Sequence, residues 1–157
     1  MRLAGYVARL FQPGHPFGYP SVFGRASVTL MTSSNSLLGP AIVTGASSGI
    51  GNAVCKRLAA SGNPIISIDI DPKGPSVEVE GHYVCDLGDE GSVLQLLADI
   101  AKDFDLSTAS SLINVAGVPG TEAASKVLEV NLLVVRRLSR IIASQFSSGS
   151  TIVNVGS

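Results

Sequence analysis

Short apolar runs alternate along the chain with longer segments whose apolar residues recur at helical spacing. The apolar runs begin at residues 41, 64, 82, 111 and 151, and we expect each of them to form a strand. Helices are expected from Ile50, from Ser92 and from Ala123. Strands and helices that alternate in this way predict an α/β fold, in which a doubly wound parallel sheet carries helices on both faces.

The helix expected over residues 123–146 is unusually apolar. Its apolar residues fall almost all round the middle of the helix, and they are Val127, Leu128, Val130, Leu132, Leu133, Val134, Val135, Leu138, Ile141 and Ile142. A helix of this kind is buried on more than one side, so we expect it to contact both the sheet and a partner subunit. The full-length protein is therefore expected to be a homo-oligomer.

Residues 1–38 differ in composition from the rest of the chain. They carry arginines but no acidic residue, and prolines and glycines interrupt any regular element. We expect an irregular N-terminal extension over residues 1–38, followed by one domain over residues 39–157. Met31 is the favoured true start, because the prolines and glycines are untypical of the amphipathic helix of an organellar transit peptide, which is the alternative.

A glycine-rich turn follows the first apolar run. From Thr44 to Gly51 it is Thr-Gly-Ala-Ser-Ser-Gly-Ile-Gly, between a predicted strand and a predicted helix. Such glycines allow the backbone to turn tightly and to approach a pyrophosphate, whose charge then lies on unpaired N–H groups at the helix start. The turn predicts a dinucleotide site, and the residues expected to contact the ligand are Gly45, Ser47, Ser48, Gly49, Ile50 and Gly51. A glycine turn that serves only close packing is the alternative.

An acidic residue, Asp69, ends the second apolar run. An acid at the tip of the second strand can accept hydrogen bonds from the ribose hydroxyls of the adenosine, and its charge repels the additional phosphate of NADP. The residues that follow, Ile70, Asp71 and Pro72, include no arginine to pair with that phosphate. Asp69 therefore favours NAD as the cofactor, and a solvated carboxylate in a turn is the alternative.

Three features together resemble the short-chain dehydrogenase/reductase family. They are the G-x-x-x-G-x-G spacing led by Thr44, the pair Asp86-Leu87 after the third apolar run, and the sequence Asn-Val-Ala-Gly that ends at Gly117. The resemblance covers residues 40–157 and implies a Rossmann-type sheet with strand order 3-2-1-4-5. The sequence ends after the fifth strand, so we expect a truncated domain that is incomplete at its C-terminal end.

The resemblance assigns a role to the Asp-Leu pair. Asp86 and Leu87 are expected to flank the adenine ring of the cofactor. A helix cap is a second role for an acid at this place, because Asp86 or Asp89 precedes the apolar pattern of the next helix.

The resemblance also assigns Asn114, Ala116 and Gly117 to the cofactor site. The small residues Ala116 and Gly117 are expected to let the ribose on the nicotinamide side pack on the backbone. The family usually has Asn-Asn-Ala-Gly here, so Val115 removes one side-chain amide and puts a structural hydrogen bond of the central strand in doubt.

Two further positions match catalytic residues of the family. Asn131 matches a helix asparagine that holds a water in a proton relay, and an asparagine satisfied within the core is the alternative. Ser157 matches the serine that hydrogen-bonds the substrate carbonyl or alcohol. No tyrosine has lysine four positions on, so the family's Tyr-x-x-x-Lys pair is absent from these residues. We therefore expect the 157 residues alone to be inactive.

These matches predict the N-terminal, cofactor-binding part of an NAD(P)-dependent oxidoreductase. It is expected to interconvert a small-molecule carbonyl and a secondary alcohol by hydride transfer. A non-catalytic nucleotide-binding or interaction module of the same fold is the alternative. The short passage from Asn114 to Asn131 is similar to the bacterial 3α-hydroxysteroid dehydrogenase/carbonyl reductase branch of the family.

Composition argues against several other classes of protein. The net charge is −1 and no basic patch is interleaved with aromatic residues, so nothing favours nucleic-acid binding. No apolar stretch has the length of a membrane span, and no membrane partner is expected. Cys55 and Cys85 lack the spacing of metal ligands, so we expect reduced thiols, no bound metal and a cytoplasmic protein.

Overall fold

The computed structural model describes residues 39–156. The predicted extension over residues 1–38, which includes Met31, and the predicted site residue Ser157 lie outside the described residues. The domain boundary at residue 39 therefore stays a prediction.

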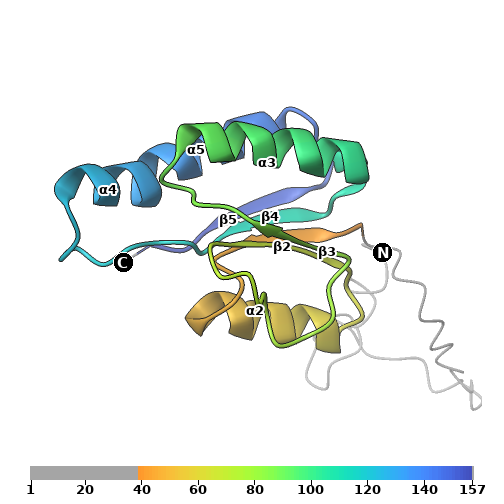
Figure 1. The fold of residues 1–157 in the computed structure, drawn as a ribbon. Helices are drawn as coiled ribbons and strands as arrows, with labels where there is room; N and C mark the ends of the chain where they lie inside the picture. The colour runs from red at the N-terminus through yellow and green to blue at the C-terminus, as the bar shows by residue number, and fades with distance from the viewer. Residues whose placement is uncertain (1–38, 157) are drawn as a thin grey trace, which may run out of the picture. The chain divides into compact units, whose positions relative to one another are not determined.

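Five parallel strands form one sheet in the order β3-β2-β1-β4-β5 (Figure 1). The strands are β1 (Ala41–Thr44), β2 (Ile65–Asp69), β3 (Gly81–Val84), β4 (Ser111–Asn114) and β5 (Thr151–Asn154). This arrangement confirms the predicted strand order, and Ala41 of β1 is in register with Ile65 on one side and with Ser111 on the other. The order reverses between β1 and β4, and ligands of such sheets bind at the carboxyl ends of the strands beside this reversal.

Helices cover both faces of the sheet, as predicted (Figure 1). On one face lies α2 (Gly49–Ala60), and on the other lie α3 (Glu90–Asp103) and α5 (Val134–Ala143). A salt bridge of 3.3 Å between Arg137 and Glu90 joins α5 to α3. The strands β1 and β2 are thus buried on both faces almost throughout, which explains why they are mostly apolar, whereas the edge strand β5 is exposed at all four positions.

The sheet separates two apolar clusters. Successive residues of a strand point to opposite faces, so Ile42, Ile66 and Leu112 pack toward α3 and α5, whereas Val43 and Ile65 pack toward α2. All five side chains are at most 1% exposed. Burial of this apolar area on both faces fixes the carboxyl ends of the central strands, where the candidate site lies.

The helix expected over residues 123–146 is shorter than predicted and is divided. A short helix, α4 (Ala124–Leu128), passes through the π-helical turn η2 (Glu129–Leu133) into α5, which ends at Ala143. Within the described residues, the single chain buries one side of this segment, and the expected contact with a partner subunit stays a prediction. One stripe is buried, made by Val130, Val134, Leu138 and Ile142. Residues four positions apart share one helix face, and apolar side chains outside that face, such as Leu132, stay exposed.

Asp89 is the N-cap of α3. Its carboxylate accepts a hydrogen bond of 2.7 Å from the Ser92 N–H. The carboxylate of Asp86 instead accepts a hydrogen bond of 2.8 Å from the Gly88 N–H. Of the two acids considered for the cap, Asp89 therefore fills this role, and Asp86 shapes the turn that precedes the helix.

This cap makes the stability of the protein depend on pH. The hydrogen bonds from Ser92 lower the pKa of Asp89 below its ordinary value of 3.8. The cap therefore stabilises the fold fully above the unfolded pKa, and this contribution is lost as the pH falls through the lower folded pKa. When the pH is lowered beneath about 4, we expect Asp89→Asn to lose less melting temperature than the wild type, because an amide caps a helix without titrating. Thermal melts check this, and an equal loss in both proteins would contradict it.

Candidate dinucleotide site

A cavity of about 300 Å³ opens at the carboxyl ends of β1, β2 and β4, where the strand order reverses. The predicted site residues that line it are Gly45, Ser48, Asp69, Asp86, Leu87, Ala116 and Gly117. Its other lining residues, which were not predicted as site residues, are Ile70, Cys85, Val118, Lys126 and Val130. The fold thus brings together the predicted cofactor residues from four separate segments of the chain.

Two glycines of the turn after β1 have left-handed backbone conformations. Gly45 has φ 65° and Gly49 has φ 48°, values that residues with a side chain rarely adopt. A Cβ on Gly45 would also lie 2.8 Å from the backbone of Ala116 at the end of β4. A Cβ on Gly51 would collide with the carbonyl oxygen of Gly45. These glycines therefore allow α2 to begin directly against the turn.

The start of α2 suits a negatively charged ligand. Its first turn holds no acidic residue, and the Ser48 side chain makes no capping hydrogen bond. The buried hydroxyl oxygen of Ser47 has no hydrogen-bond partner within residues 39–156. Unpaired N–H groups, the helix dipole and an unpartnered hydroxyl together fit a pyrophosphate.

Two backbone amides orient the carboxylate of Asp69 at the cavity. Its Oδ2 accepts a hydrogen bond of 2.8 Å from the Ser47 N–H, and its Oδ1 accepts one of 3.0 Å from the Asp71 N–H. Asp69 is therefore tied to the glycine turn rather than only solvated. A fixed carboxylate beside an anion cradle suits the hydroxyls of a ribose.

Thr44 joins the turn after β1 to the end of β4. Its Oγ1 accepts hydrogen bonds of 3.1 Å from the N–H groups of both Val115 and Ala116, and the residue is 1% exposed. The sequence pattern did not predict this role, although Thr44 leads the glycine motif. These bonds link the ends of the two central strands through backbone N–H groups. Any residue except proline at position 115 would provide the same N–H group.

Replacing Thr44 with valine is expected to lower the free energy of unfolding by about 2 kcal/mol, because two N–H groups lose their acceptor. Valine keeps the shape of threonine, so packing is preserved. Equilibrium unfolding in urea measures the loss, and Thr44→Ser, which keeps the acceptor, is the matched control. A Thr44→Val protein as stable as the wild type would show that the hydrogen bonds contribute nothing.

The chain matches a known family over most of its described length. A family model described as short chain dehydrogenase matches residues 40–157. The chain belongs to the short-chain dehydrogenase family. This membership confirms the resemblance that the glycine, Asp-Leu and Asn-Val-Ala-Gly motifs indicated.

Named relatives and solved structures agree with this family. Coniferyl-alcohol dehydrogenase from Pseudomonas sp. (strain HR199 / DSM 7063) is 32% identical over 116 residues, which cover 74% of this chain and 43% of that protein. NADH-dependent L-xylulose reductase from Ambrosiozyma monospora is 30% identical over 146 residues, which cover 74% and 53%. The structure of 4-hydroxyisoleucine dehydrogenase complexed with NADH superimposes with a TM-score of 0.64 at 26% identity, covering 76% of this chain and 56% of that one. The chain spans about half the length of these relatives.

Asn114, the last residue of β4, is not among the lining residues of the cavity. It is 2% exposed, and its Nδ2 donates to Asn154 Oδ1 at 2.8 Å and to Ser139 Oγ at 3.2 Å. Asn114 thereby links β4 to β5 and to α5. Its contact with the cofactor stays a prediction, and the partners Ser139 and Asn154 were not predicted.

Asn131 lies in the π-helical turn η2 and binds the loop after β4. Its Oδ1 accepts a hydrogen bond of 2.8 Å from the Val118 N–H, and its Nδ2 donates to the Val118 carbonyl at 2.9 Å. Asn131 is exposed, so the alternative of an asparagine satisfied within the core is wrong. The two bonds hold one wall of the cavity, and the proton-relay role implied by the short-chain dehydrogenase resemblance stays a prediction.

Tyr83 in β3 and Cys85 directly after β3 both hold their protons at neutral pH. Burial, together with the charges of Asp86 and Asp89, raises the pKa of the Cys85 thiol to about 11, so the thiol is protonated at neutral pH. Burial also raises the pKa of the Tyr83 hydroxyl, which donates to the Asp103 carboxylate at 2.8 Å. Neither group is poised to transfer a proton at the cavity.

Residues 39–156 hold neither a metal-binding cluster nor a membrane-spanning helix. Residues 39–156 contain no group of three or more His, Cys, Asp or Glu side chains that is arranged to hold a metal ion. Cys55 and Cys85 are both buried and free. Within this range, every helix falls short of the length and apolarity needed to cross a membrane.

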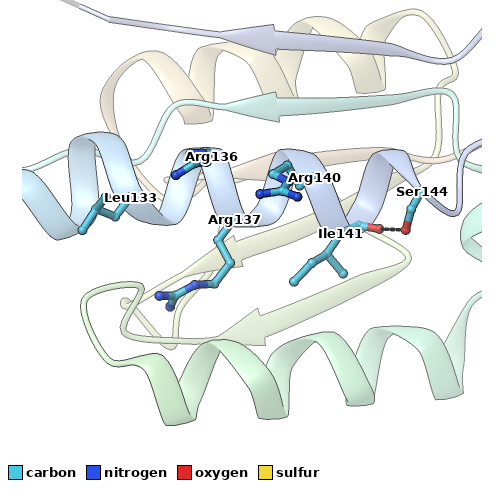
Figure 2. A pocket seen from close by; sticks show the side chains of 6 residues that line it. All are labelled: Leu133, Arg136, Arg137, Arg140, Ile141 and Ser144. Carbon is cyan, nitrogen blue, oxygen red and sulfur yellow. Dashed lines mark hydrogen bonds between the residues drawn. The ribbon is translucent and has the colours of Figure 1, made fainter.

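A second hollow, of about 500 Å³, lies along α5 and shares no lining residue with the cavity. Its lining residues are Leu133, Arg136, Arg137, Arg140, Ile141 and Ser144. Figure 2 shows Arg137 and Ile141 pointing from α5 toward the neighbouring helix α3. Arg137 pairs with Glu90 of α3 at 3.3 Å and with Glu129 of η2 at 3.7 Å. No motif of the short-chain dehydrogenase pattern predicted this hollow.

Proposed function

We propose that the chain is the cofactor-binding part of an NAD(P)-dependent oxidoreductase that interconverts a carbonyl and a secondary alcohol by hydride transfer, with NAD as the preferred cofactor. The observation that carries the proposal is the cavity at the reversal of strand order, where an anion cradle lies beside an oriented carboxylate. Membership of the short-chain dehydrogenase family supports the same activity.

The residues of the cavity fit the parts of NAD. The N–H groups of residues 48–51 would bind the pyrophosphate, Asp69 the adenosine ribose, and Asp86 with Leu87 the adenine. The orphaned Ser47 hydroxyl would find an acceptor on the same pyrophosphate. When bound, the cofactor supplies the hydride at C4 of its nicotinamide, and the protein orients it.

The preference for NAD rests on the charge of Asp69. A carboxylate accepts hydrogen bonds from ribose hydroxyls and repels a 2′-phosphate. Two relatives named for NADH, the L-xylulose reductase and the 4-hydroxyisoleucine dehydrogenase complex, support this preference.

On the substrate side the proposal rests on the family resemblance. Ala116 and Gly117 offer a small surface to the nicotinamide-side ribose. Ser157 would hydrogen-bond the substrate oxygen. Asn131 would hold the water of a proton relay. It lies close to Gly117, because a Cβ on Gly117 would be 3.4 Å from Asn131 Oδ1. The compact passage from Asn114 to Asn131 supports the 3α-hydroxysteroid dehydrogenase/carbonyl reductase branch.

Fluorescence titration with NADH tests the proposal. We expect saturable binding that ADP-ribose competes away, because ADP-ribose presents the same ribose and pyrophosphate groups. We expect no turnover of secondary alcohols by these 157 residues, because no tyrosine has lysine four positions on. A protein that does not bind NADH would refute the cofactor role, and clear turnover would refute the expected inactivity.

A non-catalytic nucleotide-binding or interaction module of the same fold is the second candidate. This module would bind NADH as the enzyme does, so binding alone does not separate the two. Sequencing of the transcript on the 3′ side of the Ser157 codon separates the two candidates. A Tyr-x-x-x-Lys motif there favours the enzyme, and a stop codon favours the module.

We also propose that the full-length protein is a cytoplasmic homo-oligomer. Leu128, Leu132, Leu133 and Ile141 support the assembly, because these side chains are between 36% and 56% exposed on neighbouring turns of α4, η2 and α5. Exposed apolar surface of this kind favours association. The two free cysteines support a reducing compartment.

A further inference from the structure

His82 of β3 bridges the middle of β2 and the turn that follows β2. Its Nδ1 lies 2.9 Å from Ser67 Oγ, and its Nε2 lies 2.9 Å from the backbone carbonyl oxygen of Asp71. A carbonyl oxygen only accepts, so Nε2 carries a proton. The Ser67 hydroxyl, which also donates to the Gly81 carbonyl oxygen at 3.1 Å, is the partner of Nδ1. Ser67 is fully buried, so the ring is anchored on the sheet at one end and holds the turn at the other.

The turn that His82 holds is the one that orients Asp69. The Asp71 N–H donates to Asp69 Oδ1 at 3.0 Å, while its carbonyl also accepts from the Gly74 N–H at 3.3 Å. Gly74 has φ 68°, and a Cβ there would lie 3.1 to 3.3 Å from atoms of the His82 ring. The turn therefore packs on the imidazole, and one of the two bonds that orient Asp69 depends on His82.

The same turn carries an apolar wall of the cavity. Ile70, between Asp69 and Asp71, lines the cavity and is 65% exposed. His82 is not a lining residue, so it acts on the cavity through Asp71 and not by contact with a ligand. A displaced turn would move both the carboxylate of Asp69 and the side chain of Ile70.

We propose that His82 is a positioning residue that sets the preference for NAD over NADP by fixing the turn that orients Asp69. This role depends on the proposed function, because it assigns an effect to the NAD site. Ribose hydroxyls bind the carboxylate well only when it is oriented, whereas a 2′-phosphate is repelled by it and gains when it moves away. Loss of the bridge therefore weakens NAD binding without weakening NADP binding.

Titrations of the full chain with NADH and with NADPH test this role. His82→Leu removes both hydrogen bonds at similar volume, and we expect it to weaken NADH binding about fivefold, as for one lost hydrogen bond, with NADPH affinity unchanged or higher. His82→Gln, whose amide can donate to the Asp71 carbonyl, is expected to restore most of the NADH affinity.

Tyr83→Phe is the matched control on the same strand. Tyr83 points to the opposite face of the sheet, where its hydroxyl donates to Asp103 at 2.8 Å. This variant loses one hydrogen bond of β3 with no connection to the turn after β2. We expect both nucleotide affinities to be unchanged, with circular dichroism confirming that all variants fold.

Hydrogen exchange without nucleotide separates this role from the proposed function. Amides of residues 70–74 are expected to exchange faster in His82→Leu than in the wild type, and at the wild-type rate in Tyr83→Phe. If the exchange responds but the wild type binds no NADH, the proposed function and the cofactor preference are refuted while the positioning of the turn is supported. If the exchange of residues 70–74 is unchanged, or if His82→Leu weakens NADH and NADPH by the same factor, the inference is wrong.

Discussion

Gly51→Ala is expected to abolish NADH binding and to lower the free energy of unfolding by about 3 kcal/mol. A Cβ at this position would collide with the carbonyl oxygen of Gly45, and a backbone atom cannot rotate away as the end of a side chain can. The start of α2 must therefore move away from β1, and the N–H groups that form the anion cradle move with it. Urea unfolding and NADH titration measure the two effects.

Gly62, just beyond the other end of α2, provides the matched control. It has φ 71°, and a Cβ there would meet nothing within 4 Å. Gly62→Ala is expected to lower the free energy of unfolding by about 1 kcal/mol because of its left-handed conformation, with NADH affinity unchanged. If Gly51→Ala binds NADH as tightly as Gly62→Ala does, the close approach of α2 to the turn is not what builds the site.

Asp69→Asn is expected to weaken NADH binding about tenfold and to bring the affinities for NADH and NADPH close together. The asparagine keeps the size of the side chain and one oxygen acceptor. It loses the charge that strengthens hydrogen bonds from ribose hydroxyls and that repels a 2′-phosphate. Parallel titrations with the two nucleotides measure the change in preference.

Asp71→Asn is the control for an effect of net charge alone. The Asp71 carboxylate accepts a hydrogen bond of 2.9 Å from the Lys73 N–H, and Asp71 is not a lining residue of the cavity. This variant removes the same charge two positions away, and we expect it to change the preference little. Equal changes in Asp69→Asn and Asp71→Asn would contradict the assignment of the ribose to Asp69.

The strands and much of the cavity could be predicted from the sequence. A strand that is buried on both faces is apolar at successive positions, so the apolar runs of β1 and β2 marked these strands. No periodicity encodes which strands are neighbours, and the meeting of Gly45, Asp69 and Ala116 at one cavity followed from the family resemblance. The glycine turn was predictable because its residue types are required by the backbone itself.

The features that could not be predicted depend on contacts between distant residues. Thr44 and Ala116 are 72 positions apart, and no local pattern marks a threonine hydroxyl as the acceptor for that backbone. Asn114 likewise bonds to Asn154 on the neighbouring strand. The apolar pattern near Leu132 did not indicate which side of the helix the chain itself buries, because it counts apolar side chains without showing which of them have a surface to pack on.

Amide chemical-shift mapping with NADH tests most directly the central claim, that a dinucleotide binds where the ends of β1, β2 and β4 meet. In isotope-labelled protein, we expect NADH to shift the amides that line or adjoin the cavity, which are those of residues 45–51, 69–70, 86–87 and 116–118. Amides beside the arginine-lined hollow of α5, at Arg136 and Arg140, are expected not to shift. Shifts confined to α5, or unmoved amides at residues 45–51 in saturating NADH, would contradict the claim.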